Sequence, residues 1–229
     1  MSWESTLSYY RIINQAVNVR LGGLHSARLV LYSVEFQELE RLQHAGAWDE
    51  ACEILVDAAC ALQSAGADFL AICSNTMHKV AGELQCRVGL PLLHIADATA
   101  EVVNALNLRR VGLLGTRFTM EEDFYRDRLK ERHGLEVLCP GDDDRNTVHR
   151  IIFDELCQGQ VHAASALKYK KIIERLVERG AEGVILGCTE ISMLVKTTDA
   201  AVPLFDTTDI HARAVAHRAM QEVSPVSMP

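Results

Sequence analysis

The sequence repeats one pattern in its two halves, and this repeat constrains the fold more than any other feature. The first copy reads G-A-D at residues 66–68, and the second reads G-A-E at residues 180–182. A short apolar run follows each copy and ends in a polar turn, where Ser74 and Cys188 stand at equal positions, 114 residues apart. An internal duplication of this kind predicts two similar halves.

Each copy also has the same order of expected elements. Amphipathic helical patterns at residues 48–65 and 163–179 precede the copies, and apolar segments that begin with a proline, at 91–95 and 203–206, follow them. Short apolar runs between helices are typical of strands in a parallel sheet built from right-handed βαβ units. The apolar segment 27–34 is predicted as a further strand, and Asp142–Asp144 as a solvated loop.

We therefore predict an α/β protein with two similar domains, whose parallel-sheet cores are related by a pseudo-two-fold duplication. The first domain comprises residues 1–97 plus 208–229, and the second comprises residues 98–207. The active site is expected in the cleft between them, because ligands bind at the carboxyl ends of parallel strands.

The first half lacks a counterpart for one strand of the second half. The Y-Y-R run at residues 9–11 matches F-Y-R at 124–126, which places Met1 opposite Thr116. The apolar segment 111–115 would then have its counterpart before residue 1. We expect a strand of the Val/Ile-Gly-Leu-Leu-Gly-Gly type upstream of Met1. Two alternatives are that another strand fills this place, or that the first domain has one strand fewer.

Cys188 stands between the end of an apolar strand and the start of a helical pattern. A helix N-terminus favours a thiolate, so we expect a lowered pKa for Cys188; the alternative is a buried, inert cysteine. With Ser74 on the opposite wall, one group could remove a proton from a stereogenic carbon while the other returns a proton to its other face. Donors for a substrate carboxylate are available at the turns: Asn75, Thr76, Thr116, Thr119, and the backbone N–H groups of Thr189 and Glu190.

Other uses of these residues are less well supported by the sequence. Covalent attack by Cys188 needs a dedicated base, for which His78 and His211 are weak candidates. A metal site formed by Cys73, His78 and Cys86 lacks a recognised ligand spacing.

Composition excludes several classes of protein. The net charge of −8 argues against a nucleic-acid partner, and the sequence has no apolar run of membrane-spanning length. The seven cysteines have no disulfide-like spacing, which fits a reducing compartment. We expect a cytoplasmic protein with a small-molecule substrate, no nucleic-acid partner and no membrane association.

The motifs S-N-T-M-H at residues 74–78, G-C-T-E at 187–190 and G-T-R-F-T at 115–119 resemble the aspartate/glutamate racemase family. The similarity is greatest to the enterobacterial L-aspartate/glutamate racemases of broad amino acid specificity, and M-S-W-E-S-T at 1–6 and F-D-T at 205–207 extend it over essentially the whole chain. The resemblance implies a homodimeric isomerase with two α/β domains that needs no pyridoxal phosphate, no metal and no other cofactor. It also implies a strand and G-G ahead of Met1.

By this resemblance Cys188 takes the Cα proton of an L-amino acid, and Ser74 delivers a proton to the other face, directly or through a water. Most family members carry cysteine in place of Ser74, and the closest relatives carry threonine. A hydroxyl is a poorer base than a thiolate, so we expect faster turnover from L to D than back. Gln43 matches a position that binds the substrate side chain. Cys157 replaces a lysine common in aspartate racemases, which favours a broader substrate range.

Two alternative functions remain open at this point. A cleft with a single cysteine also resembles decarboxylases of the arylmalonate type, although these leave the wall opposite the cysteine open, where this chain has Ser74. The chain could also be a non-catalytic carboxylate-binding protein, particularly if the first domain lacks its opening strand.

Overall fold

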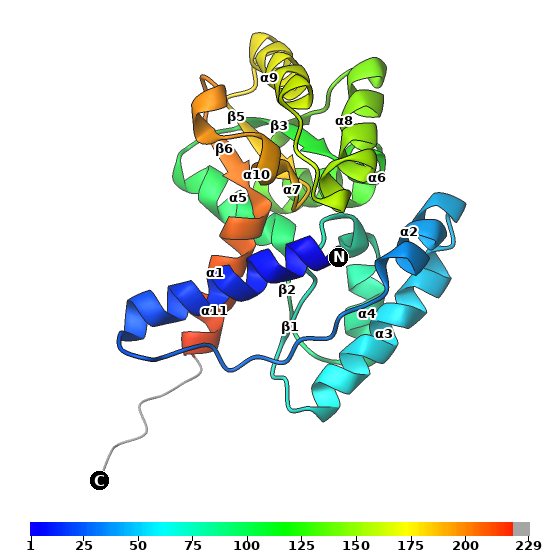
Figure 1. The fold of residues 1–229 in the computed structure, drawn as a ribbon, viewed down its shortest axis with the longest axis vertical. Helices are drawn as coiled ribbons and strands as arrows, with labels where there is room; N and C mark the ends of the chain where they lie inside the picture. The colour runs from blue at the N-terminus through cyan, green and yellow to red at the C-terminus, as the bar shows by residue number, and fades with distance from the viewer. Residues whose placement is uncertain (222–229) are drawn as a thin grey trace.

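Parallel β-strands form a separate sheet in each half of the chain (Figure 1). The computed structural model describes residues 1–221 of the 229. The first half has β1 (Leu70–Ala71) beside β2 (Leu92–Leu93). The second half has four strands in the order β4-β3-β5-β6: β3 (Arg110–Gly115), β4 (Glu136–Leu138), β5 (Gly183–Gly187) and β6 (Leu204–Asp206). The prediction of an α/β fold with parallel sheets is confirmed.

The two sheets share one pairing register, as the sequence repeat predicts. Leu70 pairs with Leu92 in the first sheet, and Val184 pairs with Leu204 in the second. In each case the first residue of the pair donates its backbone N–H to the carbonyl of the proline before the second strand, at 2.8 Å to Pro91 and 2.9 Å to Pro203. The sequence repeat is thus also a repeat of strand geometry.

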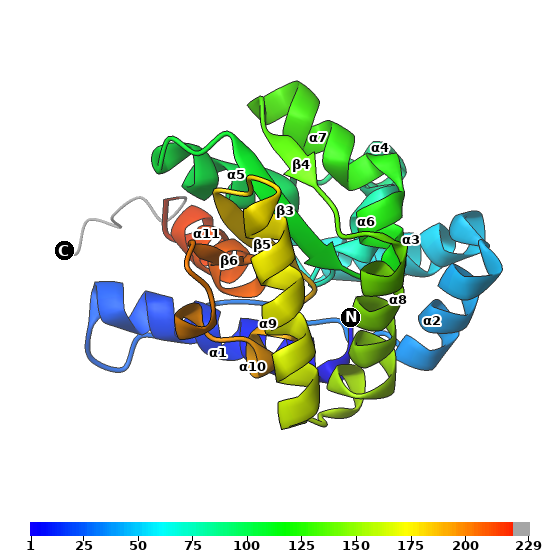
Figure 2. The same cartoon turned by 90° about the horizontal axis from the view of Figure 1, so that it is seen from above.

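Helices cover the strands on both faces, as Figures 1 and 2 show. The α-helices are α1 (Trp3–Leu21), α2 (Phe36–Ala45), α3 (Trp48–Ser64), α4 (Ala81–Val88), α5 (Ile95–Ala105), α6 (Arg117–Glu121), α7 (Asp123–His133), α8 (Asp142–Asp154), α9 (Ala163–Glu178), α10 (Ile191–Leu194) and α11 (Thr207–Gln221). Short 3-10 helices lie at Thr76–Val80, Leu156–Gln158 and Thr197–Asp199.

The central strand β3 is buried on both faces. Val111 and Leu113 pack with residues of α5 and α7, whereas Leu114 packs with residues of α8 and α9. Successive side chains of a strand point to opposite faces, so a strand between two helical layers is apolar at every position. This explains why the sequence shows a continuous apolar run here.

Helix α11 carries the chain back from the second sheet to the first half, where it lies along α1 (Figure 1). Tyr9, Ile13 and Val17 of α1 pack on Ala212, Val215 and Ala216 of α11. The domain limits 1–97 plus 208–229 and 98–207 stay a prediction, and residues 222–229 lie outside the described part of the chain.

Two expectations about local structure are wrong. Residues 27–34 are extended but form no strand ladder within the part of the chain that the structure describes. Asp142–Asp144, expected in a loop, form the first turn of α8. Acidic residues interact favourably with the positive end of a helix dipole, so three aspartates in a row are compatible with a helix start.

Gly115 allows β3 to approach β5 closely at the edge where the polar turns follow. A Cβ atom at Gly115 would lie 2.8 Å from the carbonyl oxygen of Gly187. We expect Gly115→Ala to destabilise the protein by about 1–3 kcal/mol in urea denaturation. Gly82→Ala is the control, because Gly82 is exposed in α4 with no atom within 4 Å of a built Cβ. It should stabilise by about 0.5–1 kcal/mol; equal effects would contradict this reading of Gly115.

Candidate active site

The polar turns after β1 and β5 meet at one small, partly open cavity of about 30 Å³ between the two halves. Most of the predicted site residues line it. From the first half these are Gln43, Ser74, Asn75 and Thr76, and from the second half Thr116, Cys188, Thr189 and Glu190. Thr119 does not line the cavity but hydrogen-bonds to Thr76 and Thr116 behind it.

Glu190 is a buried carboxylate held by hydroxyl groups from both halves. Ser2 and Ser5 of the first half donate to Oε1 at 2.5 and 2.9 Å, and Thr189 donates to Oε2 at 2.7 Å. Burial alone would raise the pKa of Glu190, but the Met1 ammonium and these hydrogen bonds lower it below its ordinary value. Glu190 is therefore a carboxylate that fixes α1 to the turn after β5.

Cys188 donates its thiol proton to Glu190 Oε2, with sulfur and oxygen 3.1 Å apart. Burial and the adjacent Glu190 carboxylate raise the pKa of Cys188 well above its ordinary value, although the Glu190 backbone N–H favours the thiolate. The expectation of a lowered pKa for Cys188 is therefore wrong in this structure. The helix that follows, α10, has only four residues, and desolvation outweighs its dipole.

Ser74 and Cys73 follow β1 and line different cavities, as the alternation of side chains along an extended backbone predicts. Ser74 lines the small cavity, and its Oγ accepts the backbone N–H of Met77 at 3.4 Å. Cys73 lines a different, larger hollow, and burial raises its pKa to about 11. Of the two side chains, only that of Ser74 lies across the small cavity from Cys188.

Asn75 presents an unpaired acceptor in this cavity. Thr207 donates its hydroxyl proton to the Leu186 carbonyl at 2.8 Å, so its oxygen accepts from the Asn75 amide nitrogen at 3.0 Å. This network fixes the orientation of the amide. The Asn75 Oδ1 atom is buried without a hydrogen-bond partner among the described residues, which marks a place for a donor of a ligand.

Three threonine hydroxyls join the two halves beside Asn75. Thr76 Oγ1 lies 2.9 Å from Thr116 Oγ1 and 3.3 Å from Thr119 Oγ1. Thr116 also caps α6, because its side chain accepts the Thr119 backbone N–H at 3.3 Å. Hydroxyl groups can both donate and accept, so this group can turn its protons toward a carboxylate.

The remaining wall is less polar. Gln43 on α2 donates to the Met77 sulfur at 3.1 Å. The other lining residues are Met1, Phe36, Ile152, Phe153, Cys157 and Gly187. Among the described residues that line the cavity, none is a lysine or an arginine. The cavity wall thus has no cationic side chain for a second substrate carboxylate.

His78 and His211 have structural hydrogen bonds. His78 accepts the Ile95 backbone N–H at Nε2 and donates from Nδ1 to the Ser74 carbonyl at 2.6 Å. His211 accepts from the Tyr9 hydroxyl and donates to the Leu93 carbonyl. Burial lowers the pKa of both rings, to about 4 for His211. They are neutral supports of the turns and do not contact Cys188.

Sequence reasoning missed Ser2, Ser5 and Thr207 as parts of this region, and it singled out Cys157 only for the lysine that it replaces. The first three lie in the M-S-W-E-S-T and F-D-T motifs, which pointed to them without showing that they contact Glu190 and Asn75. Within residues 1–221, no group of three or more His, Cys, Asp or Glu is arranged to hold a metal ion. None of the described helices is both long and apolar enough to cross a membrane.

Comparison with known proteins gives the family. The profile of the Asp/Glu/hydantoin racemase family matches residues 1–215. The chain belongs to this family. A curated relative of this racemase is the broad-specificity amino-acid racemase RacX of Bacillus subtilis, 26% identical over 166 residues that cover 72% of this chain and 71% of RacX.

Solved structures agree with this assignment. A putative Asp/Glu racemase from Yersinia pestis is 54% identical with a TM-score of 0.89, and the match covers 96% of each chain. An aspartate racemase homologue from Pyrococcus horikoshii is 37% identical with a TM-score of 0.79, covering 95% of this chain and 94% of that one. The resemblance to the aspartate/glutamate racemase family is confirmed.

The Glu190 network makes a prediction about stability. Ser5→Ala removes one hydroxyl from a buried carboxylate and should destabilise the racemase by about 1–3 kcal/mol at neutral pH. The pKa of Glu190 is lower in the folded state than its ordinary value of 4.5. The stabilisation from the charged Glu190 is therefore complete above pH 4.5, and it is lost as the pH falls through the pKa of the folded state. The deficit of Ser5→Ala should therefore shrink on acidification below 4.5, measured by urea denaturation.

The control for this experiment is Ser8→Ala on the same helix. Ser8 is half-buried and is not among the hydroxyls that donate to Glu190. A Ser5→Ala deficit equal to that of Ser8→Ala, or one that grows on acidification, would contradict the assignment of Glu190 as a buried, hydroxyl-bound carboxylate.

Proposed function

We propose that this chain is a cofactor-independent amino acid racemase that moves a proton between Cys188 and Ser74, with L-aspartate, L-glutamate or a related amino acid as substrate. The observation that carries the proposal is one thiol and one hydroxyl, buried side chains from different halves of the chain that line a single small cavity. Racemisation needs a group on each face of Cα, because one removes a proton while the other supplies one.

The proposed reaction from L to D begins with the Cys188 thiolate. It takes the Cα proton, the Cα–H bond breaks, and the electron pair stays on the substrate, where the carboxylate delocalises it. A new Cα–H bond then forms on the opposite face with a proton from the Ser74 hydroxyl or from a water bound to it. Proton exchange with water restores the thiolate and the hydroxyl.

Before substrate binds, Cys188 is a neutral thiol beside the Glu190 carboxylate. With the pKa of Cys188 raised and that of Glu190 lowered, the proton resides on sulfur. A substrate brings an α-ammonium group into the cavity, and a nearby cation lowers the pKa of a thiol. Glu190 Oε2, 3.1 Å from the sulfur, would hold the sulfur in place, and the thiol proton would leave to water because the lowered pKa of Glu190 makes its carboxylate a poor base. Substrate entry would thus form the thiolate where it is needed.

The cavity offers partners for both ends of an amino acid backbone. The unpaired Asn75 Oδ1 would accept a hydrogen bond from the α-ammonium group. The hydroxyls of Thr76 and Thr116, with the backbone N–H groups of Thr189 and Glu190, would hold the carboxylate while negative charge develops on it. Thr119 would orient the first two hydroxyls from behind.

Binding requires the cavity to open. A volume of about 30 Å³ is enough for roughly one water and too small for an amino acid. The contacts that close it join the two halves: the hydrogen bonds from Thr76 to Thr116 and from Asn75 to Thr207, and the ion pair of Lys79 with Glu122. We propose that the halves separate at these contacts to admit the substrate.

The proposed substrate range is broad. The absence of lysine and arginine from the described cavity lining favours substrates that do not depend on a second carboxylate. RacX, a relative of this chain, is a broad-specificity amino-acid racemase. Gln43, at the apolar end of the cavity, would contact the substrate side chain. Because Ser74 is a weaker base than Cys188, we expect faster turnover from L to D.

Two further parts of the proposal rest on the sequence. The cysteine usage supports a cytoplasmic location, and the family resemblance and chain length support a homodimer.

The experiment that tests this function follows the Cα proton of L-aspartate and L-glutamate by proton NMR in D₂O, together with chiral analysis of the products. Loss of the Cα signal should accompany formation of the D-enantiomer. Cys188→Ala should slow both by at least about 100-fold, because it removes the proposed general base. Cys60→Ala is the control, since Cys60 is exposed on α3.

Several outcomes would contradict the proposal. Exchange that is lost in Cys157→Ala and retained in Cys188→Ala would assign the base to the other cysteine of the cavity. Binding of amino acids without any Cα exchange would favour a carboxylate-binding protein.

A further inference from the structure

Aromatic rings from both halves of the chain meet beside the small cavity. His44 on α2 and Trp48 on α3 come from the first half, and Phe118 on α6 with His149 and Phe153 on α8 come from the second. The helices α2, α6 and α8 lie side by side where the halves meet (Figures 1 and 2). We call these five residues the ring cluster.

The contacts within the ring cluster cross the boundary between the halves. Between ring centroids, His44 lies 5.5 Å from Phe118 and 5.2 Å from Phe153. The His44 ring is also 5.6 Å from that of His149. Trp48 lies 5.5 Å from Phe118, with the two rings nearly perpendicular. Edge-to-face ring pairs attract one another, so the ring cluster holds the two halves together.

The ring cluster is continuous with the wall of the small cavity. Phe153 belongs to both, and Gln43, which directly precedes His44 on α2, lines the cavity from the first half. Thr116, another lining residue, caps α6, the helix that carries Phe118. Separation of the rings would therefore move two parts of the cavity wall away from one another.

The contacts of His149 favour a neutral ring. Its Nδ1 accepts the backbone N–H of Arg117 at 3.2 Å, so the ring proton is on Nε2, and a second proton would displace this hydrogen bond. Burial, followed by the Arg117 guanidinium and His44, lowers the pKa of His149 from 6.5 to about 4, whereas Asp154 on its own helix acts in the opposite direction. Protonation of His149 therefore opposes the closed arrangement.

The other charges at this boundary have partners. Nδ1 of His44 lies 3.0 Å from both the carbonyl and a carboxylate oxygen of Glu40, which are acceptors, so Nδ1 donates. Lys79 lies 4.4 Å from the centroid of Trp48 and forms an ion pair with Glu122 of the second half. Lys79 and Glu122 neutralise one another, whereas a proton on His149 would add positive charge beside Arg117.

We propose that the ring cluster is a pH-sensitive latch on the small cavity, closed while His149 is neutral and released when His149 becomes an imidazolium. Release would solvate the charged ring and part the cavity wall at Phe153. The latch would then regulate access of the amino acid substrate, and this regulatory role rests on the proposed function.

The direction of the pH response follows from the two states of His149. A solvated ring in the open form has a pKa nearer its ordinary value of 6.5, and the closed form has one of about 4. The open form therefore binds more protons, and opening becomes more favourable as the pH falls from 6.5 toward 4.

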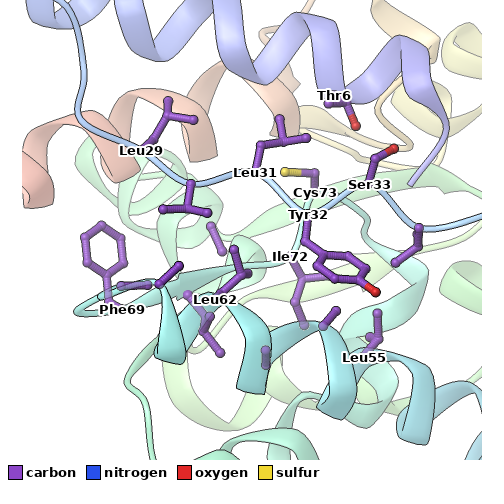
Figure 3. Close-up of a pocket in the computed structure, with 18 of the residues that line it drawn as sticks. Thr6, Leu29, Leu31, Tyr32, Ser33, Leu55, Leu62, Phe69, Ile72 and Cys73 are labelled. Carbon is purple, nitrogen blue, oxygen red and sulfur yellow. The ribbon is translucent and has the colours of Figure 1, made fainter.

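The test measures opening by thiol labelling, without substrate. The full chain reacts with a pyridyl disulfide at about pH 7.5 and about pH 5, the second being between the two pKa values of His149, and peptide mass spectrometry gives the rate at each cysteine. Cys188 and Cys157 line the small cavity, and Cys60 is an exposed reference on α3. Cys73 lines a separate hollow of about 660 Å³ in the first half, shown in Figure 3, and reports general loosening.

Two substitutions of His149 remove its titration. His149→Gln keeps an acceptor for the Arg117 N–H, and His149→Phe keeps a ring. Acid should increase the Cys188 rate relative to Cys60 in the unmodified protein by about tenfold or more beyond its increase in either variant. His25→Gln should keep the full response, because His25 is exposed and outside the ring cluster.

A further variant tests the ring contacts apart from protonation. Phe118→Ala removes the contacts with His44 and Trp48 and should increase Cys188 labelling about fivefold or more at neutral pH. An unchanged rate in this variant would overturn the latch. Equal acid responses of the unmodified protein and both His149 variants, or a rise at Cys73 equal to that at Cys188, would also overturn it. Labelling uses no catalysis, so failure of the latch is distinguishable from failure of the proposed function, which Cα proton exchange tests.

Discussion

The buried carboxylate of Glu190 is the interaction on which the arrangement of the site depends. Its two oxygens accept hydrogen bonds from Ser2 and Ser5 of the first half and from Thr189 and Cys188 of the second. A charge in this position is stable only while these donors remain, because an unpaired buried charge costs several kcal/mol. One side chain thereby fixes α1, the turn after β5 and the Cys188 thiol relative to one another.

Much of the fold could be predicted from the sequence because it is repeated. The two copies predicted the strands, the polar turns and the parallel pairing, and two similar halves facing one another then placed Ser74 and Cys188 on opposite walls of one cleft. The apolar composition of segment 27–34 predicts a strand, but a strand also needs a partner, and composition does not show whether one is present. The composition of Asp142–Asp144 predicts a loop, because a polar run at a helix start has the same composition as a loop.

The electrostatics of the site could not be predicted in the same way. A strand end followed by a helix suggested a lowered pKa for Cys188, whereas burial and Glu190 raise it. Both effects depend on how tightly the two halves close, which no local motif encodes. The hydroxyls of Ser2 and Ser5, distant in sequence from Glu190, likewise required the three-dimensional structure. The local geometry could thus be predicted from the sequence, whereas the protonation state of Cys188 depends on the contact between the two halves.

The proposal that Cys188 and Ser74 act on opposite faces of Cα is tested most directly by the variant Ser74→Ala, which should separate proton removal from inversion. With L-aspartate or L-glutamate in D₂O, we expect this variant to exchange the Cα proton through Cys188 while keeping the L-configuration. Formation of the D-enantiomer should fall by about 100-fold or more, because the second face lacks its proton donor. Ser74→Thr keeps a hydroxyl and should restore inversion. D-product formed by Ser74→Ala at the rate of the unmodified protein would contradict the assignment of opposite faces to Cys188 and Ser74.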